Sequence, residues 1–203
     1  LFDRVRRDSE ARLRTLLAPV PAITFGRFTG ETPDHEKAAV DRFHEQFPEE
    51  SLIPNELMSR DQMRESPPHL LITNYAMLEY LLLRPEDSAF FDGPSSHSWR
   101  FVVLDEAHIY DGAAGIEVAM LLRRLKDRVV GSEPGRIRCV ATSATLGQGE
   151  QDAPRVAAFA ERIFGEAFEW CEDDPHRQDV VSGTRRSMTD LAPSWGTGHP
   201  ELY

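Results

Sequence analysis

Two adjacent carboxylates and a histidine follow a short apolar run near the middle of the chain. Residues 101–104 (FVVL) are rich in β-branched side chains, and Asp105, Glu106 and His108 come soon after them. Such a run, bounded by polar residues, predicts a strand that is buried on both faces of a parallel sheet. Because ligands of open α/β sheets bind at the carboxyl ends of strands, these three side chains are candidates for chemistry.

Neighbouring carboxylates at a strand end are costly to bury unless their charge is compensated. A divalent cation with its waters can do this, and Mg²⁺ accepts one or two carboxylates together with phosphate oxygens. The simpler alternative is a turn in which Asp105 begins the next helix. The apolar strand before the acids and the Ala-His pair after them favour the metal-binding interpretation. His108 has no second histidine or cysteine at ligand spacing, so zinc is not expected.

A hydroxyl-bearing segment follows the next predicted strand. Ser143, Ala144 and Thr145 come directly after residues 137–142, and the segment lies 38 residues beyond Asp105 with one helix between them. On the residues alone, a turn in which the two hydroxyls cap local backbone groups is the simpler interpretation.

Residues 27–32 (RFTGET) join a predicted strand to a predicted helix and include groups that suit a phosphate. Gly30 would let the backbone approach a ligand closely, and Arg27 could pair with a phosphate. Thr29 lies beside Gly30 in the same turn. An ordinary strand-to-helix turn is the alternative.

Thr73 and Asn74 lie between a predicted strand and a predicted helix. The free N–H groups at the start of a helix suit a phosphate, and both side chains add donors. Capping of the helix by Asn74 alone is the alternative explanation.

Apolar periodicity predicts the elements that position these residues. Strands are expected at residues 22–26, 69–73, 101–104 and 137–142, and helices at residues 1–18, 34–47, 60–65, 75–83, 113–129 and 152–164. A sixteen-residue loop is expected at residues 84–99. The alternation of strands and helices predicts an α/β fold with a parallel sheet flanked by helices.

Composition narrows the class of protein. The 203 residues are 40% hydrophobic and 28% charged, as in globular proteins. The net charge of −11 argues against a basic nucleic-acid-binding surface, although backbone N–H groups and a few arginines can still hold phosphates. No apolar run approaches the ~20 residues needed to span a bilayer, and no signal peptide opens the chain. We therefore expect a cytoplasmic protein with no membrane partner, whose two cysteines are reduced.

Four segments together resemble the motifs of superfamily 2 helicases. Residues 105–108 (DEAH) resemble the Walker B motif, and residues 143–145 (SAT) resemble motif III at a spacing that fits the family. Residues 73–78 resemble the motif Ib region of bacterial DNA repair and defence helicases, and residues 27–32 resemble the segment between motifs Ia and Ib. Tyr75 stands where that branch usually has proline. The resemblance covers roughly residues 20–165, most of the first RecA-like motor domain of a P-loop NTPase.

The resemblance implies a role for each candidate residue. Asp105 would hold Mg²⁺ through water, and Glu106 would activate the water that attacks ATP. His108 would couple the nucleotide site to Ser143 and Thr145, which link nucleotide state to domain closure.

The resemblance also implies a nucleic-acid partner, DNA rather than RNA. The residues that would contact it are Arg27, Thr29, Gly30, Thr73 and Asn74. The other implied partner is a second RecA-like domain of the same protein.

One motif of the family is missing from the sequence. The pattern G-x-x-x-x-G-K-[ST] does not occur, because the only lysines, Lys37 and Lys126, do not follow a glycine. Without this phosphate loop, ATP cannot be bound productively. Since the chain also begins with Leu1, we expect an inactive piece of a longer protein. Residues 1–165 would be a partial RecA-like helicase ATP-binding domain without the phosphate-loop strand and helix, and residues 166–203 an acidic linker or the start of the next domain.

Two other functions stay open. A non-catalytic module could keep a degenerate motor fold in order to bind a protein partner. A metal-dependent nuclease could use Asp105 and Glu106, although no further acidic residue has a suitable spacing. A phosphate loop encoded directly upstream would favour the helicase, whereas a start codon at Leu1 would favour the module.

Overall fold

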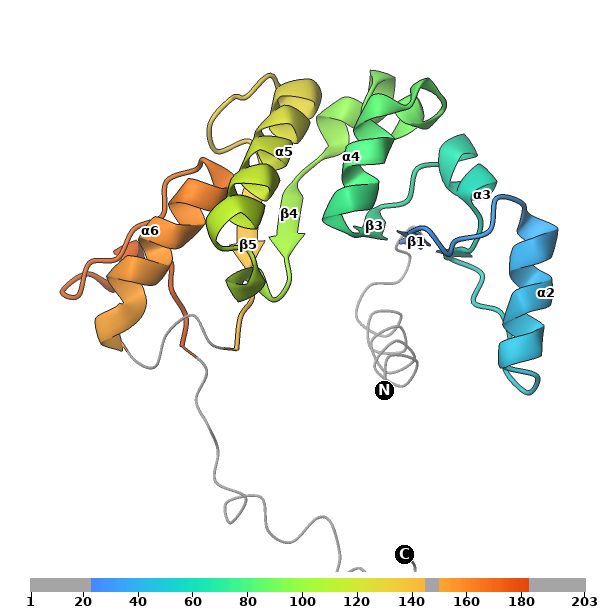
Figure 1. Ribbon diagram of the computed structural model, residues 1–203, viewed down its shortest axis with the longest axis horizontal. Coiled ribbons are helices and arrows are strands. Elements are labelled where there is room, and N and C mark those ends of the chain that lie inside the picture. Colours follow the sequence, from blue (N-terminus) through green and yellow to red (C-terminus); the bar gives the residue numbers. More distant parts are fainter. Residues whose placement is uncertain (1–22, 145–149, 183–203) are drawn as a thin grey trace, which may run out of the picture. The chain divides into compact units, whose positions relative to one another are not determined.

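The computed structural model describes residues 23–144 and 150–182 (Figure 1). These residues form two compact units. The first comprises residues 23–100 and 120–137, and the second comprises residues 101–119, 138–144 and 150–182. Thr145 and the helix predicted at residues 1–18 lie outside the described residues. Within the described ranges, no helix combines the length and apolar character needed to cross a bilayer.

The first unit contains a three-stranded parallel sheet. Strand β1 (Phe25–Phe28) lies between β2 (Glu56–Leu57) and β3 (Leu70–Thr73). In the register of β1 and β3, Phe28 pairs with Thr73. The sheet is accompanied by α2 (Glu36–Gln46), α3 (Arg60–Glu65), α4 (Tyr75–Leu83) and the later part of α5 (Gly112–Val130). The fully buried side chains of this unit include Phe28, Met63, Leu81, Phe91 and Leu125.

Local sequence explains the short helix α3. Ser59 is fully buried and caps the helix, since its side chain accepts from the Gln62 N–H while the Gln62 side chain accepts from the Ser59 N–H. This reciprocal pattern satisfies two of the free donors at a helix start. A Cβ on Gly26 of β1 would lie 2.4 Å from Met63 Sδ, so the buried Met63 side chain would have to move if any other residue replaced this glycine.

Residues 84–99 were predicted as a loop, and the structure corrects this. Two 3₁₀ helices, η1 (Pro85–Phe90) and η2 (Gly93–Ser98), occupy most of the segment. Phe90 and Phe91 are buried, and Arg128 of α5 ion-pairs with Asp92. Six-residue helices are too short to show apolar periodicity, and proline is well tolerated in the first turn of a helix. The sequence signal for a loop was therefore misleading.

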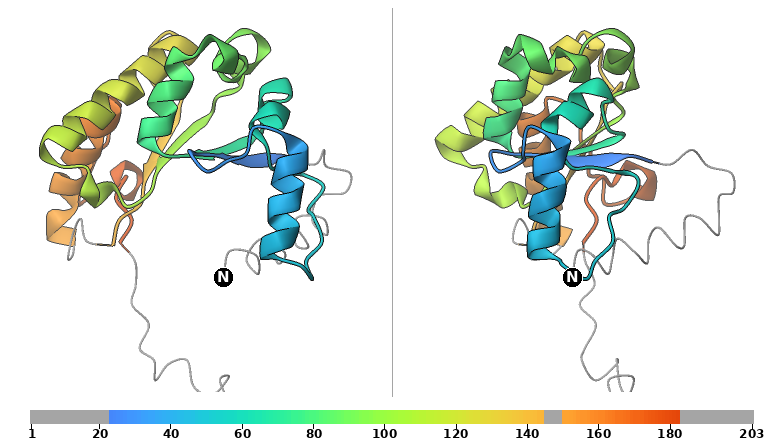
Figure 2. Two further views of the ribbon diagram at one scale, coloured as in Figure 1. Left: turned by 45° about the vertical axis from the view of Figure 1, so that its right-hand side comes forward. Right: turned by 90° about the vertical axis from the view of Figure 1, so that its right-hand side faces the viewer.

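The second unit contains a two-stranded parallel sheet. Strands β4 (Phe101–Leu104) and β5 (Arg138–Ala141) pair in register from Phe101 with Arg138 to Leu104 with Ala141. The short helices η3 (Ala107–Ile109), η4 (Glu150–Asp152) and η5 (Pro175–Arg177) join α6 (Ala153–Phe164) and the first part of α5 in this unit. Gly115, in the first part of α5, lies near Ile163 of α6, and this part of α5 runs beside α6 in the views of Figures 1 and 2.

The central strand is less buried than its sequence predicts. Phe101 and Val103 are 57% and 60% exposed, so the prediction of a strand buried on both faces is wrong in this structure. Val140, which pairs with Val103 on β5, is also exposed (43%), so within the described ranges little packs against this face of the two-stranded sheet. Parallel strands and flanking helices, by contrast, confirm the predicted α/β fold class.

Most predicted boundaries move by a few residues. The first strand begins at Phe25 and includes Arg27, which the sequence placed in the following turn. Helix α6 ends at Phe164 and is capped by Gly165, whose φ of 63° is the left-handed conformation that favours glycine. Beyond it, an antiparallel bridge between Trp170 and Gln178 and the helix η5 give residues 166–182 local structure. A domain boundary at residue 165 stays a prediction.

Candidate functional site

Two predicted acids and one predicted hydroxyl residue, Ser143, lie together at the ends of two neighbouring strands of the second unit. Asp105 and Glu106 follow β4, and Thr142 and Ser143 follow β5. Backbone hydrogen bonds between the two segments continue beyond the C-terminal ends of β4 and β5. The Thr142 N–H donates to the Leu104 carbonyl (3.0 Å), and the Ala107 N–H donates to the Thr142 carbonyl (2.8 Å). The two segments are therefore held in fixed register by backbone hydrogen bonds.

Asp105 is oriented by Thr142, a residue that the sequence analysis did not single out. The Thr142 hydroxyl donates to Asp105 Oδ1, which also accepts from the Glu106 N–H at 3.1 Å. Thr142 could have been recognised because it is the last residue of the predicted strand at residues 137–142, directly before Ser143. Instead it was interpreted only as a strand residue.

Glu106 has an unusual backbone. Its φ of 50° and ψ of 44° lie in the left-handed region, which is uncommon for any residue but glycine. Strain of this kind concentrates at functional sites. Its carboxylate Oε2 lies 3.2 Å from His108 Nδ1, and the same nitrogen lies 3.3 Å from Ser143 Oγ. His108 therefore contacts both the acid after β4 and the hydroxyl after β5.

The donor groups at this site suit Mg²⁺ better than a metal that needs a complete protein cage. Among the described residues, no group of three histidine, cysteine or acidic side chains could surround a metal ion. Asp105 is exposed, and no hydrogen bond within the described ranges involves its second oxygen, Oδ2. One exposed carboxylate that leaves the other ligands to water and phosphate is the way Mg²⁺ is usually bound.

The predicted nucleic-acid segments are brought together in the first unit. The Thr73 hydroxyl donates to the Phe28 carbonyl at 2.7 Å, so the ends of β1 and β3 are joined just where the two segments begin. Arg27 is exposed on β1, and Thr29 and Gly30 follow the strand directly. The structure therefore places these segments next to each other, although they are more than forty residues apart in the sequence.

The turn after β1 is organised by Thr32, which is buried and which the sequence analysis passed over. Its hydroxyl accepts from the Thr29 N–H (2.9 Å) and donates to the Arg27 carbonyl (2.7 Å). Its own N–H donates to the Thr29 carbonyl (3.2 Å). A single threonine thus closes the turn that contains Gly30.

Asn74 caps helix α4, as the simpler of its two interpretations predicts. Its side-chain oxygen accepts from the Met77 N–H at 2.8 Å. Capping by the oxygen leaves the amide NH₂ as a donor. A contact between Asn74 and a phosphate stays a prediction.

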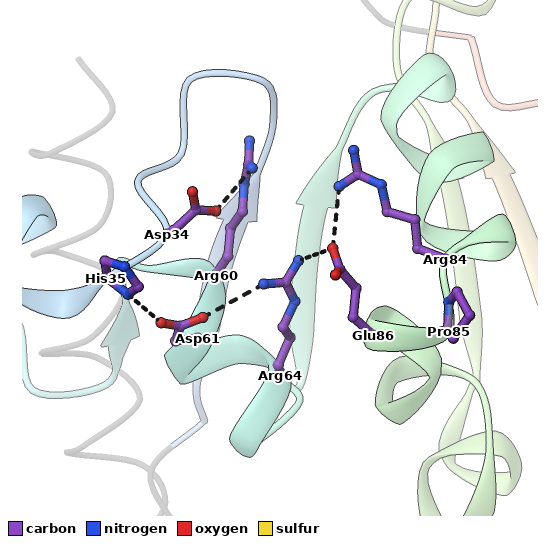
Figure 3. A pocket seen from close by; sticks show the side chains of 8 residues that line it. All are labelled: Asp34, His35, Arg60, Asp61, Arg64, Arg84, Pro85 and Glu86. Atoms are coloured by element: carbon purple, nitrogen blue, oxygen red, sulfur yellow. Dashed lines mark hydrogen bonds and ion pairs between the residues drawn. The ribbon is translucent and has the colours of Figure 1, made fainter.

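A charged pocket lies beside α3 in the same unit. Arginines and carboxylates alternate along its wall, with Arg60 next to Asp34 and Arg64 next to Glu86 (Figure 3). Arg64 also binds the fully buried Asp87 through Nε at 2.7 Å. These pairs connect the turn after β1 with η1 through α3.

The chain matches known proteins over its larger part. Residues 40–153, more than half of the chain, match the DEAD/DEAH box helicase family. The chain is also similar to the Druantia protein DruE of Escherichia coli (strain UMEA 4076-1), with 41% identity over 144 residues. That alignment covers 66% of this chain and 7% of the Druantia protein. No solved structure matches the chain.

Parallel strands flanked by helices define an α/β protein of the RecA-like type. The chain belongs to the DEAD/DEAH box helicase family. The family predicted from the DEAH and SAT segments is thereby confirmed. Members of this family generally use ATP with Mg²⁺ and interact with nucleic acid.

Proposed function

We propose that this chain carries the nucleotide-hydrolysing and nucleic-acid-contacting segments of the first motor domain of an ATP-dependent helicase or translocase. The observation that carries the proposal is the meeting of Asp105, Glu106 and Ser143 at the ends of β4 and β5, joined through His108. Strand ends are where ligands of α/β sheets bind. Family membership supports the same reaction.

The residues of the second unit divide the work of hydrolysis. Asp105, held by Thr142, would hold the Mg²⁺ ion. The ion supplies positive charge to the phosphates when it is bound. Glu106 orients the attacking water and accepts its proton, a contribution worth about 10²–10⁴-fold in rate. His108 holds the Glu106 carboxylate and transmits its position to Ser143, with Thr145 as the further hydroxyl of that segment.

The segments of the first unit contact the nucleic acid. The candidates are Arg27, Thr29 and Gly30 after β1 together with Thr73 and Asn74 after β3, and their proximity at the ends of two paired strands supports a common role. We infer DNA rather than RNA as the partner, with a place in DNA repair or defence in the cytoplasm. A second RecA-like domain of the same protein would complete the nucleotide site. The 203 residues alone would be inactive, because they contain no phosphate loop.

Glu106→Gln in the full-length protein tests this assignment. We expect the variant to lose ATP hydrolysis by about 10²-fold or more while it still binds ATP, because the amide cannot accept the proton of water. Hydrolysis is measured by phosphate release and binding by a fluorescent ATP analogue. Glu117→Gln is the matched control, since Glu117 is exposed on α5 and makes no ion pair within the described residues. Normal hydrolysis by the Glu106 variant would refute the assignment.

A further inference from the structure

We propose that Arg42 and Arg60 are positioning residues, which hold the turn of residues 29–31 in the shape that meets the nucleic acid backbone. The inference rests on the proposed nucleic-acid role of that turn. Arg60 is the first residue of α3 and Arg42 lies on α2, so two separate helices act on the same three residues. Neither arginine belongs to the segments that resemble helicase motifs.

Both arginines bind the turn through its carbonyl oxygens. Arg60 Nη2 donates to the carbonyls of Thr29 (3.0 Å) and Gly30 (3.2 Å). Arg42 Nη1 donates to the carbonyl of Glu31 at 2.8 Å. Three consecutive carbonyls are thus engaged by guanidinium groups, and hydrogen bonds with a charged donor are stronger than neutral ones.

The N–H groups of the same turn are left available. The Thr29 N–H is bound by the Thr32 hydroxyl, whereas the N–H groups of Gly30 and Glu31 make no hydrogen bond to any part of the chain that the structure describes. Successive free N–H groups in a turn form a concave site for an anion. With their carbonyls held by the arginines, Gly30 and Glu31 can offer these donors to a phosphate. This explains how a chain with a net charge of −11 could bind a nucleic acid backbone.

The surroundings of Arg60 suit a side chain that supports the turn and does not contact the nucleic acid itself. Its guanidinium lies 5.3 Å from the centre of the buried Phe28 ring, and its Nη1 lies 3.1 Å from Asp34 Oδ1 (Figure 3). The side chain is only 16% exposed, and Asp34 balances its charge. A shielded and neutralised arginine is a poor direct contact for a phosphate but a good support for backbone carbonyls.

The helix that carries Arg60 is itself anchored at both ends. Ser59 caps its start, and Arg64 in its last turn binds Asp87 at 2.7 Å and Glu86 at 3.0 Å. Arg64 also lies 5.8 Å from the centre of the Phe28 ring. Since α3 is held between the turn and η1, the position of the Arg60 guanidinium is largely fixed.

The test measures DNA binding by the full-length protein as a function of salt. A fluorescent single-stranded DNA oligonucleotide is titrated at several salt concentrations with wild type, Arg60→Met and Arg42→Met. Methionine keeps an apolar stem but cannot donate to a carbonyl. We expect Arg60→Met to lower the affinity by about 10-fold, while the slope of log affinity against log salt is unchanged, because no cation leaves the interface. Arg60→Lys should lose less, since a lysine can still reach one carbonyl.

Two comparison variants show how a direct phosphate contact and an unrelated surface arginine affect the DNA affinity and its salt slope. Arg27→Ala should reduce the salt slope by about one, as expected for a direct phosphate contact. Arg136→Met makes the same chemical change at an exposed surface position that is paired with Glu133, and it should bind DNA like wild type. Thermal melting of each variant shows whether it folds. If Arg60→Met does not fold, Arg42→Met carries the test, because Arg42 is exposed on α2.

The outcomes separate this inference from the proposed function. Wild-type affinity in folded Arg60→Met and Arg42→Met would overturn the positioning role, as would a fall in salt slope equal to that of Arg27→Ala. In both cases DNA binding by the wild type would leave the proposed function intact. If the wild-type protein itself shows no salt-dependent DNA binding, the nucleic-acid role fails and this inference fails with it.

Discussion

Glu106 is the residue proposed to activate water, and its backbone has an unfavourable left-handed conformation. A left-handed conformation costs a non-glycine residue roughly 1–2 kcal/mol, and the surrounding hydrogen bonds must hold it there. The Glu106 N–H is bound by Asp105, and the next N–H, of Ala107, by the Thr142 carbonyl. The strain is therefore maintained by the same contacts that orient the acids.

Glu106→Gly should separate stability from activity. We expect the free energy of unfolding to rise by about 1 kcal/mol, because glycine adopts this conformation without strain. ATP hydrolysis by the full-length variant should be lost, since the carboxylate is gone. Chemical denaturation of the 203-residue chain measures the stability, with Glu106→Gln as the control that keeps the strain. A destabilised glycine variant would show that the backbone at Glu106 is not strained.

The sequence could reveal a site residue when its side-chain type already suggests chemistry. It could not reveal one whose role depends on where the fold places it. Asp105, Glu106 and His108 stand out because three ionisable side chains of these types follow directly after an apolar run. Thr142 and Thr32 do not, because threonine is common in strands and turns. Only the pairing of β4 with β5 shows that Thr142 reaches Asp105.

For the helices, the predicted bounds were right where a side-chain cap fixes the helix start. They were wrong where packing against distant residues orders the segment. The predicted bounds of α3 and α4 are those of the structure, because Ser59 and Asn74 are side-chain caps that the sequence displays. The segment at residues 84–99 was missed, since its order comes from contacts far along the chain. Arg128 binds Asp92 and donates to the Leu82 carbonyl (2.7 Å), and the local sequence of residues 84–99 does not predict these contacts.

The ion pair of Asp92 with Arg128 should make a pH-dependent contribution to stability. Its hydrogen bond from Arg128 lowers the pKa of Asp92 below the ordinary 3.8. A carboxyl whose pKa is lower in the folded protein adds stability above its unfolded pKa and loses it as the pH falls through the folded value. Asp92→Asn should therefore destabilise the chain at pH 7, by at most about 1 kcal/mol because the pair is partly exposed, and should have no effect once Asp92 is protonated.

Denaturation midpoints of the 203-residue chain at neutral and acid pH check this contribution. Asp41→Asn is the matched control, because Asp41 is exposed on α2 and has no ion pair within the described ranges. An equal loss of stability at both pH values would mean that Asp92 acts by packing and not by charge.

For the whole molecule, the two units divide the proposed functions. The first contains the segments assigned to nucleic acid, and the second contains the acids assigned to hydrolysis, while α5 contributes residues to both. The α/β class was predictable because alternation of strands and helices is a property of the sequence. The exposure of Phe101 and Val103 was not, because the burial of a sheet face depends on what packs against it, and the sequence of the strand alone does not show this.

If this chain carries both the hydrolysing and the nucleic-acid-contacting segments of one motor, ATP hydrolysis by the full-length protein should depend on nucleic acid. The most direct measurement is its hydrolysis rate with increasing single-stranded DNA or RNA. We predict a rate that rises with DNA, and less with RNA, while the 203-residue chain alone hydrolyses no ATP. A full-length protein that binds neither ATP nor nucleic acid would instead be a non-catalytic interaction module. A hydrolysis rate that does not change with either nucleic acid would contradict the account.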